Sequence, residues 1–186
     1  MKDAKMKQTT RHLLLFITFL GATQTALAHM VFAEPKAVAG SYYKATMRVG
    51  HGCQGAATTG ITVFVPDGFQ GAKPQPKAGW RVTTRKTQLA QPYTSHGKTI
   101  TEDVTEISWK ADNAAAALPD AFYDEFSWMV RLPNAPTNAW VRVLQTCAQG
   151  QHDWSAIPAS GLSTQGLASP ALLLVIEPPV SSTHHH

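Results

Sequence analysis

The chain has 186 residues, with 16 Lys or Arg against 12 Asp or Glu, so its formal net charge is +4 at pH 7. The first 28 residues hold four of those basic residues and one aspartate, so that the remainder carries only +1. Nothing in this balance indicates the clustered basic surface that a nucleic-acid-binding protein needs. Residues 29–186 are enough for one domain with its own hydrophobic core.

The first 28 residues have the order of a secretory signal peptide. Four basic residues precede an apolar run at 13–20, and small residues lead to Ala26-Leu27-Ala28. This order is typical of a cleaved export signal, and the run is shorter than the roughly 20 residues that span a bilayer. We therefore predict that residues 1–28 are removed, that the protein is periplasmic, and that the mature chain begins at His29.

Beyond His29 the sequence predicts β-strands rather than long helices. Short segments rich in β-branched and aromatic residues alternate in polarity and are separated by Gly, Pro, Asn and Asp. The expected strands are 30–34, 42–49, 58–65, 80–87, 100–110, 122–132, 140–146, 152–154 and 172–176. Residues 90–97 resemble a loop, and 114–117 form a short helix-friendly patch that Pro119 ends. This pattern predicts an all-β fold, an antiparallel β-sandwich.

The predicted domain covers residues 29–178, and residues 179–186 form a low-complexity tail that we expect to be disordered. The tail ends in three histidines, His184 to His186. These histidines are either a purification remnant or a weak metal-binding segment, and they take no part in the fold argument.

The chain has two cysteines, Cys53 and Cys147, and both follow the predicted signal. An even pair in an oxidising compartment is typical of a disulfide. The alternative is a thiolate copper or zinc site that combines Cys53 with the nearby His51. The disulfide is the favoured interpretation because exported thiol pairs are usually oxidised.

A chain that begins with histidine can chelate a metal through its α-amine and its imidazole. Two donors do not complete a site, so further ligands are needed. Glu125 lies on the strand face opposite Phe126 and is either such a ligand or a solvated carboxylate. Trp154 is either a core residue or a wall of the site. His51, in a glycine-flanked loop, is either structural or a secondary metal ligand, and we expect His152 at the surface.

Several segments, in chain order, resemble the YcnI-like (DUF1775) family of exported copper-binding domains. They are residues 29–35 (HMVFAEP), 51–68 (HGCQGAATTGITVFVPDG), 76–80 (PKAGW), 107–109 (ISW), 122–126 (FYDEF), 145–147 (QTC) and Trp154. The matches cover nearly all of residues 29–158.

The resemblance implies a cupredoxin-like or immunoglobulin-like β-sandwich that binds Cu(II) through one N-terminal histidine, a single-histidine brace. Carried over to this chain, the ligand is His29, the acidic partner is Glu125, and Trp154 lies in the second shell or pocket wall. Cu(II) prefers tetragonal nitrogen and oxygen ligands, which this set supplies. The implied function is copper homeostasis or delivery without catalysis, with a membrane copper transporter or a copper chaperone as partner.

Two alternatives remain open. A histidine-brace copper monooxygenase would need a second histidine facing the first, and His51 or His152 would have to supply it. A metal-free interaction sandwich would leave the histidine at position 29 unexplained. No serine-nucleophile turn, phosphate-binding loop or paired Cys-x-x-Cys motif occurs in the sequence, so no catalytic residue is assigned.

Overall fold

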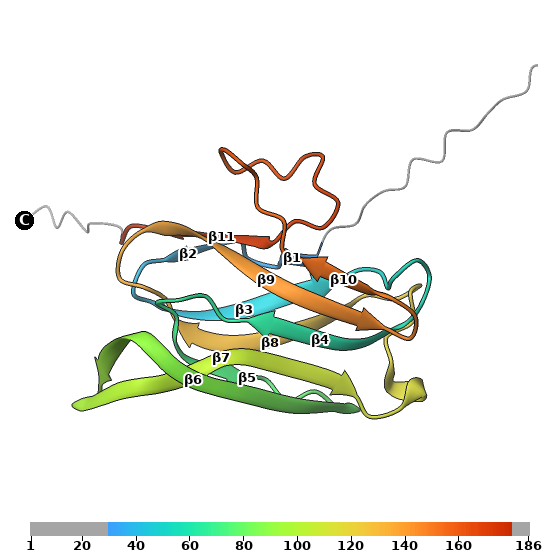
Figure 1. The fold of residues 1–186 in the computed structure, drawn as a ribbon, viewed down its shortest axis with the longest axis horizontal. Coiled ribbons are helices and arrows are strands. Elements are labelled where there is room, and N and C mark those ends of the chain that lie inside the picture. The colour runs from blue at the N-terminus through green and yellow to red at the C-terminus, as the bar shows by residue number, and fades with distance from the viewer. Residues whose placement is uncertain (1–29, 180–186) are drawn as a thin grey trace, which may run out of the picture.

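The computed structural model describes residues 30–179, which form eleven β-strands in two packed sheets (Figure 1). The predicted all-β sandwich is confirmed. The predicted signal peptide, His29 and residues 180–186 lie outside the described residues. Within the described part, no helix is long and apolar enough to cross a membrane.

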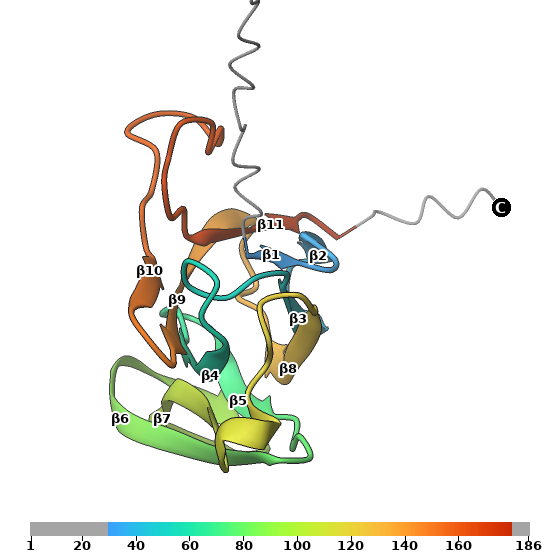
Figure 2. The same cartoon turned by 90° about the vertical axis from the view of Figure 1, so that its right-hand side faces the viewer.

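The smaller sheet contains four strands and carries the first described segment at its edge. Its order is β1 (Val31–Phe32), β3 (Tyr42–Val49), β8 (Asp124–Arg131) and β5 (Gln70–Pro74). The pairs are antiparallel, as predicted. Figure 2 shows β3 and β8 on one side of the molecule and β9 and β10 on the other.

The larger sheet carries the two long strands of the molecule. Its order is β2 (Lys36–Val38), β11 (Leu172–Glu177), β9 (Thr137–Cys147), β4 (Thr58–Phe64), β7 (Lys98–Ala111) and β6 (Trp80–Ser95), and β10 (Gln151–Trp154) pairs with β9. β2 pairs in parallel with β11, whereas the other pairs are antiparallel. The 3₁₀ turn η1 (Ala114–Ala116) follows β7, and the Asn113 side chain caps it.

The core lies between the two sheets, and aromatic rings join them. On β8 the side chains of Phe126, Trp128 and Val130 are buried, in the alternation that the sequence predicts. The Phe126 ring lies edge-on to Trp80 of β6, with ring centres 4.9 Å apart, and to Trp109 of β7, at 5.8 Å. These contacts bind the two sheets together through one buried side chain.

The prediction of a loop over residues 90–97 is wrong. β6 continues to Ser95, because the chain pairs again with β7 from Tyr93 onward after an irregularity that begins at Gln88. Pro92 lies within that irregularity, where a missing backbone N–H costs no ladder hydrogen bond. The sequence also gave no signal for the short strands β2 and β5.

The predicted disulfide between Cys53 and Cys147 is confirmed, with the two Cα atoms 5.9 Å apart. Cys53 lies between β3 and β4, and Cys147 ends β9. The two cysteines are 94 residues apart in sequence, so the bond constrains most of the domain. The alternative of a thiolate site at Cys53 is wrong in this structure, because both sulfur atoms are consumed in the bond.

Replacement of both cysteines by alanine should lower the free energy of unfolding by about 4–5 kcal/mol, because a loop of this length loses much entropy when it is closed in the unfolded chain. Urea unfolding of the two proteins measures the difference. Thiol labelling of the unreduced wild type should find no reactive cysteine. A loss below about 1 kcal/mol would contradict this account of the bond.

Candidate functional site

The segment between β3 and β4, residues 50–57, is held in one shape by its own backbone, and we call it the site loop. Cys53 and Ala56 exchange two backbone hydrogen bonds of 3.0 Å each. Between them, Gln54 and Gly55 have φ angles of 52° and 87°, which is the pattern of a two-residue type I′ turn. A Cβ atom at Gly52 would overlap the Ala56 carbonyl oxygen, so this position requires glycine.

The hairpin from β9 to β10 meets the site loop through the disulfide. Gly150 has a φ of 75°. The Cys147 N–H donates to the carbonyl oxygen of Gly150 at 3.1 Å and closes the turn. After this turn, His152 and Trp154 lie two residues apart on β10 and therefore share one face of it. The disulfide holds this hairpin against the site loop, which carries His51.

Three rings from these two segments gather at one place, and we call His51, His152 and Trp154 the ring cluster. The ring centres of His51 and His152 are 5.9 Å apart. The indole of Trp154 lies 5.9 Å from His51 and 5.5 Å from His152. Trp154 is 2% exposed, whereas both histidines are partly exposed.

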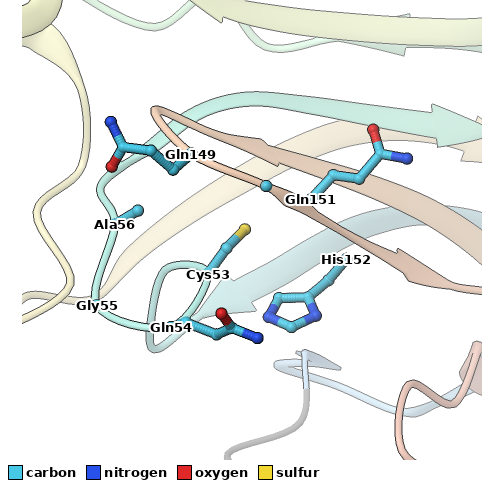
Figure 3. A pocket seen from close by; sticks show the side chains of 8 residues that line it. Cys53, Gln54, Gly55, Ala56, Gln149, Gln151 and His152 are labelled. Atoms are coloured by element: carbon cyan, nitrogen blue, oxygen red, sulfur yellow. The ribbon is translucent and has the colours of Figure 1, made fainter.

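A pocket of about 470 Å³ opens beside the ring cluster. Its walls come from the turn of the site loop and from the β9–β10 hairpin, and Figure 3 shows the His152 ring and the Gln54 side chain together at one end of it, below Cys53. The remaining lining is mostly polar, with Gln149 and Gln151 from the hairpin. Of the ring cluster, His152 lines this pocket, whereas Trp154 packs into the hydrophobic core.

Gln145 on β9 is 1% exposed and forms hydrogen bonds with the segments that carry the ring cluster. Its amide nitrogen donates to the backbone oxygen of His51 at 2.7 Å and to the Thr58 hydroxyl at 2.8 Å. Its amide oxygen accepts the indole N–H of Trp154 at 3.0 Å. One buried side chain thus connects the site loop, β4 and β10, and both of its N–H donors are used.

The contacts of the two imidazoles bear on where their protons lie. The Nδ1 of His51 is 2.6 Å from the carbonyl oxygen of Gly52, and because a carbonyl oxygen only accepts, Nδ1 carries the proton. In the neutral ring the lone pair then lies on Nε2. The pKa of His152 is lowered by its burial and by the neighbouring His51, so His152 is neutral at pH 7. A neutral imidazole is the form that binds metals.

Glu125 lies on the exposed face of β8, as predicted from the alternation, but it is apart from the ring cluster. Its carboxylate accepts the Arg48 Nε–H at 3.0 Å. Strand register places Val31, Arg48 and Glu125 in one row across β1, β3 and β8. The backbone of β3 therefore separates Glu125 from β1, the first described strand. Its role as a metal ligand stays a prediction.

Trp154 belongs to the hydrophobic core and also contacts two imidazoles. Its role as the wall of a metal site stays a prediction. His152, expected at the surface, is instead partly buried within the ring cluster. Sequence reasoning also missed Gln145. The signal for His152 was its position two residues before Trp154 in a strand, which puts both side chains on one face.

Across residues 30–179, no group of three or more His, Cys, Asp or Glu side chains is placed to hold a metal ion. The ring cluster contributes two imidazoles. A metal centre of higher coordination number at this place would therefore need donors from outside the described residues.

The fold and the site together define an immunoglobulin-like β-sandwich with a histidine and tryptophan cluster next to its disulfide. The model of a family described as a domain of unknown function (DUF1775) matches residues 29–176, and the chain belongs to this family. The predicted family is thereby confirmed.

A similar solved structure is described as the crystal structure of an uncharacterized protein from Nocardia farcinica that reveals an immunoglobulin-like fold. It is 24% identical, with a TM-score of 0.61, over 81% of this chain and 99% of the other. At this identity the likeness shows the fold alone. No curated protein matches the chain.

Replacing Gln145 with leucine should destabilise the domain by about 2–4 kcal/mol, because it leaves the buried Trp154 N–H and the His51 carbonyl without their partner. Urea unfolding gives the energy, and near-UV circular dichroism reports the environment of the indole. Gln149→Leu is the matched control, since Gln149 is exposed on the same hairpin, and it should change stability by less than about 0.5 kcal/mol. Equal effects of the two replacements would contradict the role of Gln145.

Proposed function

We propose that the mature protein is a periplasmic Cu(II)-binding protein that buffers or delivers copper, with the metal held by the N-terminal amine and imidazole of His29. The observation that carries the proposal is the pairing of β1 with β3. Val31 lies opposite Arg48, and Arg48 is three residues before His51. His29 directly precedes Met30 in the sequence, so the proposal has the copper ligand tethered to the chain just before β1, whose partner strand β3 leads into the site loop.

The neighbourhood of that tether suits a copper ion. Cu(II) binds amine and imidazole nitrogen and carboxylate oxygen in tetragonal geometry. Trp154 offers a buried apolar wall against two imidazoles, and such a wall limits the access of water to a metal. Glu125 is proposed as the acidic ligand on the strength of the family resemblance. The family match begins at His29, the residue that the predicted cleavage makes first.

The proposed location in the periplasm draws support from the disulfide, because such bonds persist in oxidising compartments. A copper carrier in that compartment would exchange its ion with a membrane copper transporter or a copper chaperone. Both partners require a site that releases its metal, which fits a terminal residue rather than an enclosed cage.

One observation favours a second candidate, the histidine-brace copper monooxygenase. Such an enzyme needs another imidazole facing the terminal one, and the structure brings His51 and His152 to within 5.9 Å of each other, measured between ring centres. A carrier and an oxidase differ in one measurable property, the turnover of O2 in the presence of a reductant.

Blocking the terminal amine should remove high-affinity Cu(II) binding and leave the fold intact. One alanine inserted before His29, or acetylation of the amine, takes away one of the two chelating nitrogens, and we expect affinity to fall about a hundredfold or more. Mass spectrometry of the exported protein first establishes the mature N-terminus, and competition titration then measures affinity. Both proteins carry His184 to His186 replaced by serine. Equal affinity of the blocked and native proteins would refute the terminal site.

Replacing Glu125 with glutamine tests the acidic ligand, because it keeps the shape and removes the charge. We expect about a tenfold loss of Cu(II) affinity, or 1.4 kcal/mol. Glu106→Gln is the matched control, because Glu106 forms a similar exposed pair with Arg85 on the other sheet. If both variants bind as the wild type does, Glu125 is not a ligand.

The same proteins decide between carrier and oxidase. We expect peroxide production with copper and a reductant to stay at the level of free copper in the wild type and in Glu125→Gln alike. Turnover well above free copper would replace the carrier with the monooxygenase.

A further inference from the structure

A second pocket, of about 410 Å³, lies where the tip of the β6–β7 hairpin meets the smaller sheet, and it shares no residue with the pocket beside the ring cluster. We propose that this pocket, which we call the hairpin pocket, binds an organic phosphate, that is, a phosphate monoester on an apolar or aromatic body. The proposal goes beyond the proposed function, because it involves neither copper nor His29, and its test does not depend on either.

The hairpin pocket is positively charged. Lys73 of β5 and Arg131 of β8 both line it, and no Asp or Glu of the described residues does. Among residues 30–179, neither of these two cations forms an ion pair with a carboxylate. Lys44 of β3 lies opposite Met129 and adds an exposed cation on the same face. Two unpaired charges at the pocket match a phosphate monoester, which carries about −1.5 to −2 at pH 7, better than a singly charged carboxylate.

Arg131 is held in position by acceptors that an anion would outcompete. Its guanidinium donates to the Gly40 carbonyl oxygen at 3.4 Å, to Gln70 Oε1 at 3.3 Å and to Asn134 Oδ1 at 3.3 Å. All three acceptors are neutral, and these distances exceed the length of about 2.7–2.9 Å that is usual between a cation and an anion. The planar guanidinium fits two oxygens of a phosphate at once. A phosphate would therefore form shorter bonds than the present partners do.

The other walls of the hairpin pocket suit the body of such a ligand. Tyr42 of β3 lies opposite Arg131 and is 71% exposed, and Met129 of β8 is 43% exposed. Tyr93 of β6 also lines the pocket. A ligand that covers these side chains removes apolar surface from water, and aromatic rings stack on one another. The volume of about 410 Å³ is within the usual range of small-molecule pockets, roughly 300–1,000 Å³.

A bulge in β5 places Lys73 at the pocket. Gln70 pairs with Arg131 and Lys73 pairs with Met129, so β5 has one extra residue between these two pairs. Residues three apart in a regular strand point to opposite faces of the sheet, whereas Gln70 and Lys73 both line this pocket. Gly71, inside the bulge, has a φ of 63°, which glycine adopts without strain.

The carboxylate of Asp103 on β7 fastens the hairpin to this bulge. It accepts the Gly71 N–H at 2.7 Å and the Tyr93 hydroxyl at 2.6 Å. It also accepts the Val104 N–H at 2.7 Å. Asp103 is 8% exposed and does not line the pocket, so its charge is directed to these three donors. The two sides of the pocket are therefore joined before any ligand binds, which lowers the entropy cost of binding.

The test follows the backbone amide signals of the exported, metal-free protein by NMR during titration with phenyl phosphate at low salt. Phenol, benzoate and inorganic phosphate are titrated in parallel, because they lack the anion, the phosphate and the ring, respectively. His184 to His186 are replaced by serine, so that no metal ion at the tail binds the phosphate. Lys73→Gln and Arg131→Gln each remove one charge from the pocket. Lys110→Gln is the matched control, because Lys110 is an exposed lysine of β7 that does not line the pocket.

We expect saturable shifts of the Gly71 and Ser95 amides, with a Kd for phenyl phosphate of about 1 mM or less. Phenol, benzoate and inorganic phosphate should each bind at least about tenfold more weakly. Lys73→Gln and Arg131→Gln should each lose at least about fivefold in affinity, and Lys110→Gln should bind as its parent does.

Thermal unfolding verifies the fold of each variant. Lys73 is exposed, so its replacement still tests the proposal if Arg131→Gln proves unstable. Three results would each overturn the proposal: no shift of the amides at the pocket, unchanged affinity in the folded Lys73 and Arg131 variants, or binding of phenol, benzoate or inorganic phosphate that is as tight as that of phenyl phosphate.

Discussion

The geometry of the ring cluster depends on one buried amide, that of Gln145. Its side chain is long enough to reach the backbone of the site loop, the hydroxyl of Thr58 and the indole of Trp154 at once. Glutamine alone among the neutral side chains of this length supplies two donors and one acceptor in a plane. Because the amide is buried, each unpaired atom would carry a desolvation cost, and the three segments are therefore held in one arrangement.

The disulfide and the type I′ turn add covalent and conformational constraints to the same place. Cys53 fixes the site loop to the end of β9, and Gly52 allows the loop to close on the Ala56 carbonyl. A side chain on a loop fixed in this way loses little freedom when it binds an ion, so less of the binding energy is spent on ordering it. The loop end of the sandwich is thus rigid where such ends usually are mobile.

Local pattern was enough to predict the parts of the fold where one strand face is buried. β3 matches its predicted bounds, and the exposed position of Glu125 follows from alternation with Phe126. Pattern failed at the end of β6, where pairing with β7 outweighs the polar composition and Pro92. It also failed for His51 with His152, because their approach depends on the disulfide and on strand pairing between distant segments, and neither leaves a periodic signal.

The ion pair of Glu125 with Arg48 bears on where a copper ion could bind more than on how tightly it would bind. Exposed pairs of this kind contribute at most about 1 kcal/mol, so a metal would displace Arg48 at little cost. The backbones of β1 and β8 are two strand spacings apart, about 10 Å, with β3 between them. A copper ion shared by His29 and Glu125 would therefore lie over β3, on the face that Arg48 occupies. An ion near His51 would lie beyond the end of β3 and leave the Arg48 pair intact.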